Sequence, residues 1–242
     1  NLGRFFEKDL KESNIAPVMF HDLEETGRSI ALISKDSERT MATYLGAAVD
    51  LHEEDISSDL FKGYQFFHIE GYLVQNQELI RKALRLAKSH GLSVSIDMAS
   101  FNVVKENRDF FETIIKEYVD IVLANETEAE SFTGEKPEKA LSRMSSMADI
   151  AVIKLGKKGS LIKRGSEEHT ITIEKVKSVD STGAGDLYAA GFLYGICMGQ
   201  SLGTCGKVGS ILGAHITEVI GAKMDDETWK AVRKKVGEVC YD

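Results

Sequence analysis

The sequence contains few residues that would divide the chain into separate units. Its 242 residues include only two prolines, Pro17 and Pro137, and no serine- or glycine-rich linker. Because such segments mark breaks between independently folded parts, a second domain is not expected. The length suffices for one α/β core, so we predict a single domain over residues 1–242.

Cysteines and long apolar runs are scarce as well. The three cysteines, Cys197, Cys205 and Cys240, lack the spacing of metal ligands, which favours a reducing cytoplasm. No apolar run approaches the ~20 residues of a membrane-spanning helix, and no signal peptide is visible. We therefore predict a cytoplasmic protein that does not enter a membrane.

The charge of the chain argues against one class of partner. Lys and Arg number 30 and Asp and Glu number 38, which gives a formal net charge of −8. Nucleic acid backbones require clustered positive charge, so nucleic acid is not an expected partner.

The middle of the chain alternates between two hydrophobic patterns. Nearly continuous apolar runs predict strands at 64–69, 92–96, 119–124 and 150–155. Amphipathic runs predict helices at 77–90, 104–118 and 136–147. This alternation is typical of a parallel sheet with helices on both faces. We predict an α/β protein of three layers, α/β/α, with a mostly parallel central sheet.

The two ends of the chain follow other patterns. The first part predicts a helix at 2–13, a strand at 18–20, and a hairpin of 29–33 with 40–45 through a turn at 34–38. The last part predicts a hairpin of 160–164 with 170–173, and helices at 186–199, 202–216 and 225–239.

The most informative segment is DSTGAGD at residues 180–186, between a β-rich stretch at 176–179 and a helix. Small residues at 183–185 let several backbone N–H groups point at one anion, and the helix dipole adds to the attraction. An acid in that position, Asp186, makes sense as a proton acceptor beside a phosphate. A capped helix after a glycine turn would explain a bare G-x-G-D, but the whole segment favours a phosphate site.

Residues 180–193, DSTGAGDLYAAGFL, resemble the C-terminal signature of the ribokinase-like (PfkB) sugar and nucleoside kinases. The resemblance implies that Gly183, Ala184 and Gly185 form an anion hole for the transferring phosphoryl group. It also implies that Asp186 is the catalytic base on the substrate hydroxyl, and that the cofactors are ATP and Mg²⁺.

The segment after strand 119–124 has two compatible interpretations. By local pattern, Asn125 caps a helix and Glu128 completes a capping box. The resemblance adds that this N-x-x-E belongs to the Mg²⁺ and phosphate network, with Glu128 acting on the metal through water.

The segment after strand 150–155 reads GKKG at residues 156–159. By itself it is a β-turn with two solvated lysines. The matching L-G-x-x-G of the family makes Gly156 and Gly159 candidates for contact with the nucleotide phosphates, with Lys154 facing ATP. It is not a Walker A loop, and Tyr188 stands where a dinucleotide fingerprint needs its third glycine.

Four further candidates complete the predicted site. Asp97 follows strand 92–96 and either contacts substrate or metal or caps the turn. The resemblance adds Thr182 and Gly209 as nucleotide-binding residues, and a monovalent cation such as K⁺ near Asp180. Relatives often carry Asn where Gly209 stands, which weakens the case for base contacts there.

The hairpin within residues 17–45 resembles the family's lid, a small sheet that closes over the acceptor and excludes water. A plain edge hairpin is the structural alternative. Arg28 would either reach substrate or phosphate from this lid or, as the sequence favours somewhat more, point into solvent. A homodimer through the lid is also expected. The family's opening strands have no counterpart here, so we expect an N-terminal portion of a full-length member to be missing.

These features predict ATP-dependent transfer of the γ-phosphate to a hydroxyl of an adenosine-like nucleoside or of a sugar. A nucleoside is favoured by the lid and by residues 69–72; ribose, fructose or a ketodeoxy sugar is the alternative. The sequence argues against two other classes of protein. A non-catalytic nucleotide-binding relative is disfavoured by Asp186 and its glycines, and an oxidoreductase by the absent dinucleotide fingerprint.

Overall fold

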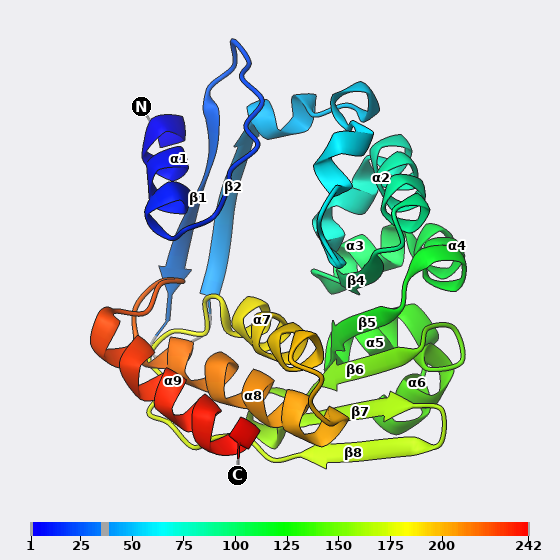
Figure 1. The fold of residues 1–242 in the computed structure, drawn as a ribbon, viewed down its shortest axis with the longest axis vertical. Helices are drawn as coiled ribbons and strands as arrows, with labels where there is room; N and C mark the ends of the chain where they lie inside the picture. The colour runs from blue at the N-terminus through cyan, green and yellow to red at the C-terminus, as the bar shows by residue number, and fades with distance from the viewer. Residues whose placement is uncertain (1, 35–38, 242) are drawn as a thin grey trace.

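The structure is a computed structural model that describes residues 2–34 and 39–241. Its centre is a six-stranded sheet in the order β3-β4-β5-β6-β7-β8 (Figure 1). The strands are Phe66–Glu70, Ser93–Asp97, Ile121–Asn125, Ile150–Lys154, Ser160–Arg164 and Glu167–Ile171. Strands β3 to β6 run parallel, and β7 and β8 add an antiparallel hairpin. The predicted mostly parallel sheet is confirmed.

Helices cover both faces of this sheet, as the strand composition requires. In β5, Ile121 and Leu123 pack against one helical layer, whereas Val122 and Ala124 pack against the other. Successive strand residues point to opposite faces, so strands that are apolar throughout need two covers. One cover is α2 (Gln77–Ser89), α3 (Phe101–Glu106), α4 (Arg108–Tyr118), α5 (Glu126–Thr133) and α6 (Pro137–Met144). The other is α7 (Ala184–Cys197) and α8 (Leu202–His215), with α9 (Asp226–Tyr241) packed outside them.

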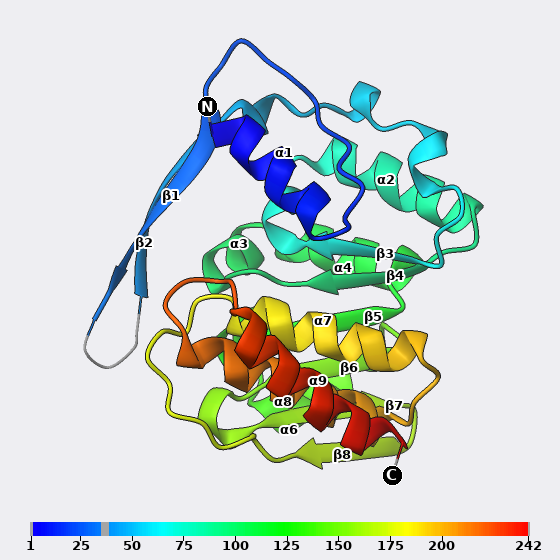
Figure 2. The same ribbon diagram turned by 60° about the vertical axis from the view of Figure 1, so that its left-hand side comes forward.

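A separate two-stranded sheet projects from this body (Figure 2). Its strands, β1 (Thr26–Ile33) and β2 (Arg39–Gly46), are antiparallel, which confirms the predicted hairpin. The predicted turn at 34–38 includes residues 35–38, which lie outside the described residues. Apolar side chains of the hairpin, Ile30, Leu32 and Met41 among them, are exposed. Helix α1 (Leu2–Glu12) precedes the hairpin.

Three sequence-based predictions about elements were wrong. Residues 18–20 form no strand, and Val18 and Phe20 are exposed. Residues 176–179 also lack strand structure. β propensity alone does not create a strand that has no neighbour to pair with. The helix predicted at 104–118 is two helices, because the chain breaks at Asn107 between α3 and α4.

Short 3₁₀ helices make many of the connections. They are Ala47–Asp50, Glu53–Asp55, Ser58–Phe61, Gly71–Gln75, Gly156–Lys158 and Ile216–Glu218.

In the described part of the chain, no helix has the length and apolarity that crossing a membrane requires.

Candidate active site

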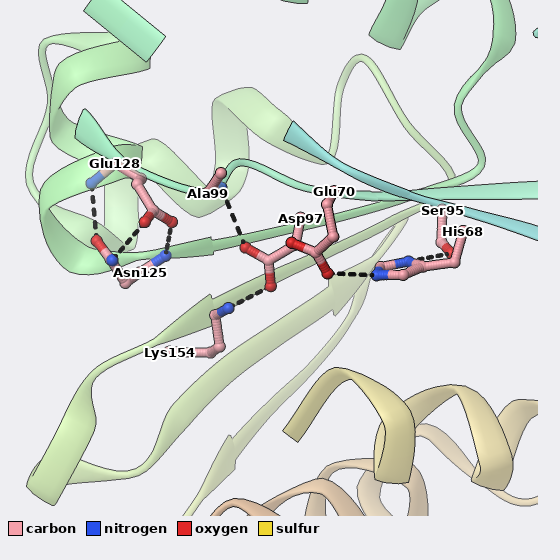
Figure 3. Close-up of polar contacts among 8 residues, drawn as sticks. All are labelled: His68, Glu70, Ser95, Asp97, Ala99, Asn125, Glu128 and Lys154. Atoms are coloured by element: carbon pink, nitrogen blue, oxygen red, sulfur yellow. Dashed lines mark hydrogen bonds and ion pairs between the residues drawn. The ribbon is translucent and has the colours of Figure 1, made fainter. Parts of the chain in front are cut away.

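Four neighbouring parallel strands end in a polar residue at the same edge of the sheet (Figure 3). Glu70 ends β3, Asp97 ends β4, Asn125 ends β5 and Lys154 ends β6. The strand register pairs Glu70 with Asp97 and Asn125 with Lys154. Ligands of open parallel sheets bind beyond the carboxyl ends of the strands, so this edge is the candidate site.

Lys154 and Asp97 form an ion pair at the centre of this edge (Figure 3). Their side chains are only 14% and 9% exposed, respectively. Burial opposes the charged ammonium, but the charges of Asp97, Glu128 and Asp186 outweigh it, so the pKa of Lys154 is raised. The lysine therefore brings a fixed positive charge into the site at neutral pH.

The start of α7 faces this ammonium group. Gly183 precedes the helix with a φ of 79°, the left-handed conformation that favours glycine. A Cβ atom added to Gly185 would lie 3.3 Å from the Lys154 Nζ. Ala184 and Gly185 are half-buried, and Asp186, in the first turn of the helix, is exposed. Gly183 itself is buried against Ala222, so the accessible part of the helix start is residues 184–186. This part lies beside a cation, as a phosphate site requires.

Asn125 and Glu128 form the predicted capping box at the start of α5. The Asn125 backbone N–H donates to Glu128 Oε2 at 2.7 Å, and the Glu128 N–H donates to Asn125 Oδ1 at 2.9 Å. Glu128 is only 2% exposed. Its pKa is raised to about 7, chiefly by burial. The charge of Lys154 lowers this pKa, whereas the charge of Asp97 raises it further.

The residues at this edge suit a magnesium ion that arrives with a nucleotide. Glu70, Asp97 and Glu128 supply carboxylate oxygens, the ligand type that Mg²⁺ prefers. Within residues 2–34 and 39–241, no three His, Cys, Asp or Glu side chains are grouped as a ready-made metal site. Mg²⁺ usually keeps waters and phosphate oxygens in its shell and takes only one or two carboxylates from the protein.

Asp180 anchors the loop that leads into α7. Its carboxylate is fully buried and accepts hydrogen bonds from the backbone and hydroxyl of Thr182, at 2.9 and 2.7 Å, and from Gly221 N–H at 2.7 Å. These bonds tie two loops together next to the helix start. The roles predicted for Asp180 toward a cation and for Thr182 toward nucleotide stay predictions.

The three remaining glycine candidates differ in their surroundings. Gly156 has a φ of 56° and open space around its Cβ position. A Cβ on Gly159 would lie 1.9 Å from the Ile171 carbonyl oxygen, so this glycine is needed for chain packing. Gly209 packs against Tyr188, whose carbonyl oxygen would lie 2.9 Å from an added Cβ. Of these three glycines, only Gly156 has open space at its Cβ position.

Arg28 lies on the hairpin and contacts the hairpin itself. Its guanidinium pairs with Glu25 at 3.0 Å and lies 5.1 Å from the centre of the Tyr44 ring. The predicted contact of Arg28 with substrate stays a prediction.

Glu70 also lies at this edge; the sequence pointed to its segment, residues 69–72, but gave Glu70 itself no role. His68 Nδ1 and Ser95 Oγ are 2.8 Å apart, and His68 Nε2 and Glu70 Oε1 are 3.2 Å apart (Figure 3). The bond to His68 lowers the pKa of Glu70. The sequence signals were its place at the end of an apolar strand and the segment 69–72, which favours a nucleoside. The neighbouring Gly71 packs against the chain after β4.

Comparison with known proteins agrees with this fold. The profile of the pfkB family of carbohydrate kinases matches residues 1–229. Two crystal structures, a probable sugar kinase from Rhizobium etli CFN 42 and adenosine kinase from Sinorhizobium meliloti, each share 32% identity and a TM-score of 0.92. Each alignment covers 97% of this chain and 74% of the other. An uncharacterized sugar kinase of Archaeoglobus fulgidus is 28% identical over 224 residues, 91% of this chain and 88% of its own length.

The fold, the site and these matches define an enzyme that phosphorylates small molecules. The chain belongs to the PfkB family of carbohydrate kinases. Within that family it is a sugar or nucleoside kinase.

Proposed function

We propose that this chain transfers the γ-phosphate of ATP to a hydroxyl group of an adenosine-like nucleoside. The hairpin that resembles a nucleoside-kinase lid and the similarity to the Sinorhizobium meliloti adenosine kinase support this acceptor. A sugar acceptor is the second candidate, because two of the relatives described above carry the names probable sugar kinase and uncharacterized sugar kinase.

The observation that carries the proposal is the accessible carboxylate of Asp186, in the first turn of α7 behind Gly183 and Gly185. Phosphoryl transfer has a loose transition state, so an enzyme accelerates it mainly by positioning and by stabilising charge. The N–H groups at the start of α7 and the Lys154 ammonium supply that stabilisation. Asp186 accepts the proton of the acceptor hydroxyl while the hydroxyl oxygen forms its bond to phosphorus.

The remaining predicted residues support this step. Asn125 and Glu128 would hold Mg²⁺ through water; the ion offsets the charge of the nucleotide phosphates when bound. Gly156 lines the phosphates, and the lid closes over the acceptor and excludes water. A K⁺ ion near Asp180 and a homodimer through the lid remain part of the proposal.

An ADP-release assay with a panel of nucleosides and sugars tests the proposal. Asp186→Asn should lower turnover by ~10²–10⁴-fold, the usual contribution of a general base, and leave ATP binding nearly unchanged. Asp109→Asn is a matched control, because Asp109 is also an exposed acid in the first turn of a helix, α4. Wild-type turnover in Asp186→Asn would refute the assignment of the base.

A further inference from the structure

We infer that Asp97 is a positioning residue: it holds the Lys154 ammonium against the glycine-lined start of α7, where that ammonium meets the transferring phosphoryl group. This inference depends on the proposed function and deepens it. It gives Asp97 a task different from the substrate contact expected from the sequence.

The geometry of the ion pair is the first support. Lys154 and Asp97 end two strands, β6 and β4, that are separated in the sheet by β5. Their side chains nevertheless meet, with most of both surfaces removed from water. The same Nζ atom lies 3.3 Å from the Cβ position of Gly185. An ammonium has three donors, so Lys154 can keep its bond to Asp97 and also donate to a phosphate.

The chain around Asp97 is built to hold this carboxylate. Its Oδ1 accepts the backbone N–H of Ala99 at 3.4 Å (Figure 3). Ala99 has a φ of 66°, a left-handed conformation that is unfavourable for alanine. Gly71 packs so closely that an added Cβ would lie 2.5 Å from the Asp97 carbonyl oxygen. Strained and tightly packed backbone of this kind is often found at functional sites.

The energetics of the ion pair between Lys154 and Asp97 favour a functional role over a stabilising one. A buried ion pair contributes little net stability, because desolvation offsets the attraction between the charges. A lysine has a long flexible stem and would lose much rotamer freedom on binding a phosphate. Asp97 removes that freedom in advance, because it holds the ammonium in one place before a phosphate binds.

The test measures ATP and ADP binding by calorimetry, because Lys154 is expected to meet the phosphoryl group that ADP lacks. Lys154→Met should lower the ratio of ATP to ADP affinity about 10- to 100-fold, the range for a hydrogen bond to a charged group. Asp97→Asn should lower the same ratio at least about fivefold. Asp97→Asn should have no further effect in the Lys154→Met background, because a positioning residue acts only through its partner.

Two sets of variants separate this role from a structural one. The double variant Asp97→Asn/Lys154→Met leaves no lone buried charge, so its Tm should lie within about 5 °C of wild type. Asp97→Glu keeps the negative charge, so its ratio of ATP to ADP affinity should lie within about threefold of the wild-type ratio. Lys163→Met is the matched control. Lys163 forms an ion pair of 2.8 Å with Glu168 but lies beside Ala151, at the other end of β6.

The outcomes distinguish this inference from the proposed function. An unchanged or increased ATP preference in Asp97→Asn, or an equal effect of Asp97→Asn in both backgrounds, would overturn the positioning role alone. No saturable ATP binding by the wild-type protein would overturn the proposed function and this inference together.

Discussion

The Glu128 carboxyl should make the stability of the nucleotide-free protein depend on pH. Its pKa is raised from 4.5 to about 7, chiefly by burial. In the unfolded chain the carboxyl ionises above about pH 4.5, whereas in the folded protein it stays protonated up to about pH 7. Its favourable contribution is therefore complete below pH 4.5 and is lost as the pH rises through 7. The difference between the two pKa values corresponds to about 3 kcal/mol.

Glutamine at this position isolates the effect. Glu128→Gln stays neutral and does not titrate. Its side chain keeps one oxygen for the Asn125 backbone N–H but loses the oxygen that accepts from Asn125 Nδ2, which lowers stability by the same amount at every pH. In urea unfolding with EDTA, the unfolding free energy of the variant relative to that of wild type should therefore rise by about 2–3 kcal/mol from pH 5 to pH 8.

The neighbouring acid Glu130 supplies the control for this experiment. Its side chain is half exposed and paired with Lys136. Glu130→Gln should differ from wild type by the same small amount at both pH values. If the difference between Glu128→Gln and wild type is also constant from pH 5 to 8, the raised pKa is wrong.

Four glycine or alanine positions give further predictions. Gly185→Val places a side chain at the Lys154 ammonium, so ATP should no longer raise the Tm although the fold is retained; a normal ATP-induced shift would contradict the anion hole. Gly159→Ala should lower the free energy of chemical unfolding by more than about 3 kcal/mol, because the added Cβ meets the Ile171 carbonyl oxygen. Gly156→Ala, which has open space around the added Cβ, should lower it by only about 1–2 kcal/mol. Equal losses in the two variants would argue against the collision at Gly159. Ala99→Gly relieves a left-handed alanine and should stabilise the protein by about 0.5–1 kcal/mol in the same assay; a destabilised variant would contradict this.

Local signals in the sequence were enough to locate the helix start at the centre of the site. Small residues at 183–185 permit the turn, and Gly183 adopts the left-handed conformation that only glycine adopts easily. The capping box of Asn125 and Glu128 was equally readable, because it depends on residues three apart. The apolar runs of the parallel strands predicted the layered fold, since each strand must be covered on both faces.

The tertiary structure decided which of these residues meet. Asp97 and Lys154 are 57 positions apart in sequence, and their contact depends on strand order and register, which no local pattern specifies. The same is true of Glu70, which becomes part of the site because β3 lies beside β4. The sequence alone could therefore determine the chemistry available to this protein. Packing of distant segments decided which charges face each other, because side-chain contacts across a sheet are set by the alignment of whole strands.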